Sequence, residues 1–193
     1  MKTRTFFLFL TVLLLLALPA VGATVVWIQP PSQTQVQDGQ TVSINVDIAN
    51  VTDLYGYQFS IDYNDALLAP TAVTEGPFLA TGGPTFFYTD FSDDTYTPGE
   101  IDIFDSLYLF GPGVTEGATP ATLVSLQFLV LPGNGVSPIT FDDQSFLNSV
   151  SQDLTSGIAF NPGLISTPEP ATYGVAGSAL IGLAWLLRKK VRR

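Results

Sequence analysis

Residues 55–63 alternate strictly between large apolar and small or polar side chains, and this pattern constrains the fold more than any other stretch. Tyr55, Tyr57, Phe59, Ile61 and Tyr63 occupy every second position, with Gly, Gln, Ser and Asp between them. A period of two places the apolar side chains on one face of a β-strand. A helix would need apolar residues three or four positions apart. The stretch therefore predicts a half-buried strand, ended by turn-forming residues at 64 and 65.

Short segments of similar character recur along the chain, separated by turns that contain Gly and Pro. They are 24–28, 42–48, 85–88, 100–109, 122–131, 139–141 and 158–160. Such a series predicts an all-β fold, a single jelly-roll-like antiparallel β-sandwich. We expect irregular excursions at 74–97 and 149–156.

The start of the chain has the three parts of a secretory signal peptide. Lys2 and Arg4 precede an apolar run from Phe6 to Leu18, and small residues end at Ala23. The apolar run is shorter than the ~20 residues that a membrane span needs. We therefore expect signal peptidase to remove residues 1–23, which form a signal helix, rather than a permanent anchor at this end.

The tail from residue 166 contains three elements in order. A motif of Pro168, Glu169 and Pro170 comes first, and an apolar stretch at 173–187 follows it. The chain ends in a basic cluster that consists of Arg188, Lys189, Lys190, Arg192 and Arg193. The cluster predicts that the apolar stretch crosses the membrane as a helix with its end in the cytoplasm. The expected organisation is a signal segment (1–23), one sandwich (24–165) and a tail (166–193).

Charge is divided sharply between these parts. All seven Lys and Arg lie in the two end segments, whereas sixteen of the seventeen acidic residues lie in the sandwich. A domain with a charge of about −16 is excluded as a nucleic-acid binder, because that binding needs Lys and Arg. The chain also lacks His and Cys, which excludes catalysis by Ser-His or Cys-His pairs. A glycosidase needs two carboxylates at a set distance, but among sixteen carboxylates some pair will meet that distance by accident, so the pairs are no evidence of catalysis. We therefore expect that the protein is not an enzyme.

Acidic residues crowd together between 90 and 105. The group comprises Asp90, Asp93, Asp94, Glu100, Asp102 and Asp105. A calcium ion takes 6–8 oxygen ligands and would relieve their repulsion. The first five of these residues are the ligands we expect for such an ion, although their spacing is not that of an EF-hand. The alternative is a set of solvated carboxylates that confer solubility, with no cofactor required.

Aromatic side chains are the other candidates, because exposed rings can stack on sugars or contact a protein partner. We expect core positions for Trp27, Phe87, Phe104 and Phe128. Phe91 and Tyr96 are flanked by acidic residues and are expected at the surface, where they could bind a partner.

The run LYGYQFSIDY at 54–63 resembles the early strands of a cohesin domain. The strand at 42–48 precedes it, and Val73 and a step at Gly76 follow. The resemblance implies a nine-stranded jelly roll that binds a dockerin module, a fold shared with a group of carbohydrate-binding modules. Asn64 and Asp65 stand where the usual family pattern has Asp-Pro.

The tail resembles the PEP-CTERM sorting signal of Gram-negative bacteria. In that family an exosortase is taken to recognise and remove the tail, which releases the protein from the inner membrane to the cell surface or an extracellular polysaccharide matrix. The sequence thus suggests an exported, non-enzymatic module that binds a dockerin-like protein. A carbohydrate-binding module for extracellular polysaccharide and a purely structural matrix protein are the alternatives.

Overall fold

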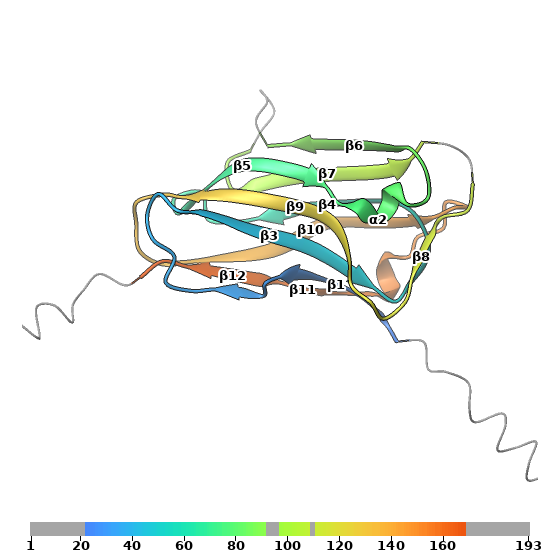
Figure 1. Ribbon diagram of the computed structural model, residues 1–193, viewed down its shortest axis with the longest axis horizontal. Helices are drawn as coiled ribbons and strands as arrows, with labels where there is room; N and C mark the ends of the chain where they lie inside the picture. The colour runs from blue at the N-terminus through green and yellow to red at the C-terminus, as the bar shows by residue number, and fades with distance from the viewer. Residues whose placement is uncertain (1–21, 92–96, 109–110, 169–193) are drawn as a thin grey trace, which may run out of the picture.

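The computed structural model describes residues 22–91, 97–108 and 111–168, and these form a sandwich of two β-sheets (Figure 1). The first layer, here called the β3 sheet, has the order β11 (Ile158–Asn161), β1 (Thr24–Gln29), β3 (Thr41–Ala49), β9 (Ala121–Val130) and β5 (Leu68–Glu75). The second, the β4 sheet, has the order β2 (Ser32–Gln33), β12 (Gly163–Ser166), β10 (Val136–Asn148), β4 (Val51–Asp62), β7 (Glu100–Leu107) and β6 (Thr85–Asp90). β8 (Val114–Glu116) pairs with β4 beside this path.

The core lies between the sheets and follows from the alternation along their central strands. In β3 the inward residues Val42, Ile44 and Val46 are buried, while the residues between them are polar. β4 supplies the opposing layer with Tyr57, Phe59 and Ile61. Burial of these side chains provides most of the stabilisation, at roughly 25 cal/mol per Å² of apolar area.

Stacked aromatic rings fill the middle of this core. Phe59 and Phe146 are nearly parallel, with an interplanar angle of 8° and centroids 6.2 Å apart. Tyr57 stacks on Phe59 at 5.5 Å and on Phe146 at 5.9 Å. The cluster ties β4 to its neighbour β10, which pairs with it through most of its length.

The short helix α2 (Pro77–Ala80) follows β5 through a close approach of two backbone segments. A Cβ atom at Gly76 would lie 2.1 Å from the carbonyl oxygen of Thr122. The Gly76 N–H donates a 2.8 Å hydrogen bond to the Leu123 carbonyl. Glycine is therefore required here by the space between β5 and β9, and α2 places Phe78 and Leu79 in the core.

The structure confirms the all-β sandwich and corrects parts of the strand assignment. β5 lies where no strand was expected, α2 lies within the expected excursion at 74–97, and β10 is much longer than 139–141. β6 confirms the strand expected at 85–88. The arrangement is not wholly antiparallel, because β1 pairs with β11 and β12 with β2 in parallel. The two ends of the described chain leave from opposite ends of the sandwich (Figure 1).

The two predicted helices at the ends of the chain lie outside the described residues, apart from the short segment 22–23 of the signal region. Within the described ranges, no helix is long and apolar enough to cross a membrane.

Candidate functional site

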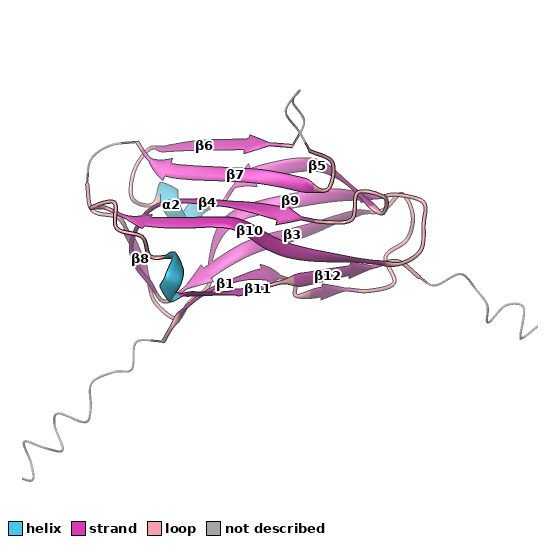
Figure 2. Cartoon of the chain, turned by 180° about the vertical axis from the view of Figure 1, so that it is seen from behind, coloured by secondary structure: helices cyan, strands magenta, loops and turns pink. Residues whose placement is uncertain are grey.

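One broad surface stands out on the sandwich, the outward side of β6, β7, β4 and β10. Figure 2 shows these four strands side by side on the near layer. We call this surface the outer face. It is built from cross-strand rows, because residues paired in register point to the same side of a sheet. One row contains Tyr88, Phe104, Gln58 and Ser145, and the next contains Phe86, Ser106, Gly56 and Leu147.

These two rows make the apolar half of the outer face. The side chains of Phe86, Tyr88 and Leu147 are 52%, 47% and 38% exposed, which is high for large apolar residues. The rings of Phe86 and Phe104 meet edge to face at 64°, with centroids 6.1 Å apart. Aromatic pairs of this geometry are held in place by their quadrupoles, so the apolar half presents a defined shape.

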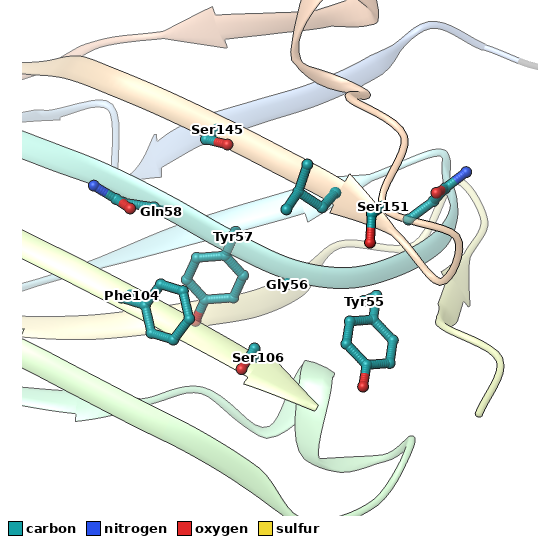
Figure 3. A pocket seen from close by; sticks show the side chains of 10 residues that line it. Tyr55, Gly56, Tyr57, Gln58, Phe104, Ser106, Ser145 and Ser151 are labelled. Carbon is teal, nitrogen blue, oxygen red and sulfur yellow. The ribbon is translucent and has the colours of Figure 1, made fainter. Parts of the chain in front are cut away.

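A hollow of about 200 Å³ opens in the apolar half (Figure 3). Its lining comes from β4, β7, β10 and the following turn, with Tyr55, Gly56, Tyr57, Gln58, Phe104, Ser106, Ser145, Leu147, Asn148 and Ser151. Gly56 keeps it open, because a side chain there would begin 3.1 Å from Ser106 and project into the space. The hollow could therefore accept one apolar side chain of a partner, with hydroxyl and amide groups at its rim.

The other half of the outer face is acidic. Asp62 lies directly opposite Glu100, and Asp102 lies opposite Asp90. Burial first, and then the negative charge of Asp142, raises the pKa of Asp62 above its usual value. Burial and the nearby Asp102 likewise raise the pKa of Glu100. Like charges in directly opposed positions destabilise a sheet, so the repulsion between these carboxylates lowers the stability of this half of the sheet.

Asp105 lies beneath the outer face rather than on it. The sequence grouped this residue with the surface carboxylates, but its side chain is 0% exposed. The reason is that the alternation of β7 runs unbroken through Ile101, Ile103, Asp105 and Leu107, which turns Phe104 outward. The expectation that Phe104 belongs to the core was therefore wrong.

The Asp105 carboxyl group contacts the hydroxyl group of Tyr57, which donates its proton to another acceptor. The Tyr57 hydroxyl donates to the Leu123 carbonyl oxygen at 2.8 Å and lies 3.2 Å from Oδ2 of Asp105. A hydroxyl has a single proton to donate, so the second contact is a good hydrogen bond when Asp105 is protonated and donates. Burial, followed by the charge of Glu75, raises the pKa of Asp105 from 3.8 to about 7.

The residues singled out from the sequence are only partly brought together. Asp90, Glu100 and Asp102 lie on adjacent strands, while Asp93, Asp94 and Tyr96 lie outside the described residues. Within the described part, no group of three or more acidic, His or Cys side chains is arranged to hold a metal ion. Calcium binding stays a prediction.

The aromatic candidates are distributed differently from expectation. Phe128 is buried, and Phe87 is half-buried against the core, as expected. Phe91 is also half-buried and packs on the core. Trp27 is half-buried on β1. Of the sorting motif, Pro168 is the last described residue, and Glu169, Pro170 and the basic cluster lie beyond it.

Sequence reasoning missed the hollow and its lining. Gly56 and Leu147 were not singled out, because the hollow forms only when β4, β7 and β10 lie together. One signal was available: Ile101 and Ile103 set the phase of β7, and that phase turns Phe104 and Ser106 outward.

Comparison with known proteins gives a consistent result. The family model described as Cohesin domain matches residues 28–165. The sixth cohesin of scaffoldin B from Acetivibrio cellulolyticus, solved in complex with a dockerin, is similar with a TM-score of 0.61 and 13% identity, covering 76% of this chain and 100% of that chain. A type I cohesin–dockerin complex from Clostridium thermocellum is similar with a TM-score of 0.60 and 17% identity, and the match covers 80% of this chain and 99% of that chain. A non-cellulosomal cohesin from the archaeon Archaeoglobus fulgidus is similar with a TM-score of 0.59 and 12% identity, and the match covers 80% of this chain and 98% of that chain. No curated protein matches the chain in sequence.

Proposed function

Because the chain belongs to the cohesin family, whose domains are non-catalytic protein-interaction modules, we propose that it binds a dockerin-like protein through the outer face outside the cell. The observation that carries the proposal is the combination of an apolar hollow and exposed aromatic side chains on four contiguous strands. Large exposed apolar side chains that gather on one surface mark interaction sites. Aromatic anchors surrounded by polar groups are the usual composition of a protein interface.

A protein partner fits this surface better than a polysaccharide. Sugar stacking would favour coplanar exposed rings, but Phe86 and Phe104 meet edge to face. Phe91, the described member of the predicted aromatic pair, packs against the core. The rows of the outer face instead mix apolar side chains with Gln58, Ser106 and Ser145, which can hydrogen-bond a partner's backbone.

The proposal is tested by affinity capture with residues 24–168, which hold every described strand and the whole described core. The immobilised domain is exposed to the extracellular fraction of its source organism, and bound material is identified by mass spectrometry and sugar analysis. We expect a protein with paired calcium-binding loops, released by a chelator because such loops need the metal to fold. Polysaccharide captured in place of protein would contradict the proposal.

A matched pair of variants shows whether capture uses the outer face. Leu147→Asp places a charge at the hollow, whereas Val136→Asp places the same charge at a 49% exposed apolar residue at the far end of β10. We expect Leu147→Asp to abolish capture and Val136→Asp to leave it unchanged. Equal capture by both variants would show that the partner binds outside the outer face.

We also propose that an exosortase processes the tail and that the domain is thereby released from the inner membrane. The sequence motif at 168–170, the apolar stretch and the basic cluster support this. β12 ends at Ser166, and the Thr167 N–H donates to the Gly135 carbonyl, so the motif follows the folded domain directly. Replacement of Pro168, Glu169 and Pro170 by alanine should leave the protein in the membrane fraction. Unchanged release would contradict exosortase processing.

A further inference from the structure

The acidic half of the outer face has no counterpart of opposite charge within the domain. The chain has no Lys, Arg or His between residues 5 and 187. The carboxylates of Asp62, Glu100, Asp102 and Asp142 nevertheless lie on three adjacent strands, in rows next to the apolar half. Directly opposed like charges cost stability. Burial first, and then the neighbouring carboxylates, raise the pKa values of Asp62 and Glu100.

The two halves of the outer face are continuous and have a fixed spacing. Asp102 and Ser106 are four residues apart on β7, and Ser60 and Gly56 lie beside them on β4. At about 3.3 Å per residue along a strand, the row of Asp102 and Ser60 lies about 13 Å from the row of Ser106 and Gly56, where the missing side chain of Gly56 leaves the hollow open. The Ser60 hydroxyl donates to Asp102 at 2.5 Å, which fixes the position of that carboxylate.

We infer that the partner is a polypeptide segment that presents Lys or Arg to the acidic half and an apolar side chain to the hollow, about 13 Å away. This inference rests on the proposed function and adds the chemistry of the partner. Cations from the partner would remove the repulsion in the acidic half, which is the charge complementarity that sets specificity and association rate at interfaces. An anionic polysaccharide would be repelled, and a neutral one brings no cation.

The spacing restricts the partner segment further. A helix rises 1.5 Å per residue and makes one turn in 3.6 residues, so a helical segment that runs along β7 would carry its basic and apolar side chains about seven or eight residues apart, on one face. An extended segment would carry them about four residues apart. In both cases the apolar contact supplies the desolvated anchor, and the ion pairs lie toward the rim.

The test selects peptides from a random library displayed on phage, using immobilised residues 24–168 at physiological salt. Three variants are compared with the unaltered domain. The acidic-half variant is Asp62→Asn, Glu100→Gln and Asp102→Asn. The hollow variant is Phe104→Ser and Leu147→Ser, which changes two of the large side chains that line the hollow. The control removes the same charge elsewhere, with Asp38→Asn, Asp65→Asn and Glu116→Gln, none of which belongs to the rows of the outer face.

We expect enriched peptides to carry Lys or Arg together with an apolar residue at one of these two spacings. Their affinity should fall about tenfold or more in the acidic-half variant, which corresponds to about 1.4 kcal/mol, and should also fall in the hollow variant. The control should change affinity by less than about twofold, because screened charges outside the contact contribute little.

The outcomes separate this inference from the proposed function. Peptides without cations, whose binding falls in the hollow variant alone, would overturn the inference and leave the proposed protein-binding function standing. Enriched peptides that respond to neither variant, or an absence of enrichment, would overturn both. Equal losses in the acidic-half and control variants would show that only the overall charge is sensed, and would also overturn the inference.

Discussion

Replacement of Asp105 by Asn should remove a pH dependence from the stability of the sandwich. The carboxyl group is fully buried beneath the outer face. Its Oδ1 atom has no hydrogen-bond partner within the described part of the chain. Glu75 and Tyr57 are the titratable groups that face it. An asparagine of nearly the same shape keeps a donor and an acceptor at this position and does not ionise.

The sign follows from proton binding in the two states. The pKa of Asp105 is about 7 in the folded protein, and an unfolded aspartate has a pKa near 3.9. The folded state binds the proton more tightly, so the contribution is complete below pH 4 and is lost as pH rises toward and through 7. The full difference is on the order of 4 kcal/mol, an upper limit because local relaxation and water entry reduce the cost of the buried charge.

The assay is urea unfolding of residues 24–168 at several pH values, followed by circular dichroism. Between pH 5 and pH 8 the unaltered domain should lose roughly 2.5 kcal/mol more unfolding free energy than Asp105→Asn does. Asp38→Asn, which removes an exposed carboxylate from a turn, should follow the unaltered domain. Parallel curves for the unaltered domain and Asp105→Asn across this range would refute the reasoning.

Three other predictions concern stability. Gly76→Ala should prevent stable folding, because its Cβ would overlap the Thr122 carbonyl group. The control Gly117→Ala, whose Cβ meets nothing within 4 Å, should change the unfolding free energy by less than about 0.5 kcal/mol. Equal melting temperatures for the two variants would contradict the packing described for β5 and β9. Tyr57→Phe should cost roughly 1–2 kcal/mol in urea unfolding, because it removes a buried hydroxyl that contacts both Leu123 and Asp105; an unchanged midpoint would show that these contacts add nothing. Sodium chloride should raise the melting temperature, because it screens repulsion among the carboxylates. If calcium binds to Asp90, Asp93, Asp94, Glu100 and Asp102, the melting temperature should rise further in a calcium salt than in a magnesium salt at matched ionic strength. Equal melting temperatures in the calcium and magnesium salts would contradict that site.

The sequence was most informative where one strand lies between a core and a polar surface. The alternation at 55–63 predicted β4 closely, because only a half-buried strand satisfies a period of two. β5 escaped detection because Pro70 interrupts its pattern. A proline is tolerated there since β5 is the edge strand of the β3 sheet. β10 was underestimated because its register shifts between Asp142 and Ser145, which breaks the alternation.

The candidate site was less predictable, for a physical reason. Its members come from β4, β6, β7 and β10, and Gly56 and Leu147 meet across ninety residues of sequence. The acidic residues near position 100 were visible in the sequence, but their division between the surface and the core depends on the phase of β7. Asp105 shows the limit most clearly, since a carboxylate at an inward position contradicts the pattern that defines a core.

The most direct test of the central claim is to map the binding surface by NMR. Residues 24–168 labelled with nitrogen-15 are titrated with the purified partner from the capture experiment, and the amide signals that change are assigned. We expect changes along β6, β7, β4 and β10, centred on Gly56, Phe104 and Leu147. Changes confined to the opposite surface, around Ser43 and Gln127 of the β3 sheet, would contradict it.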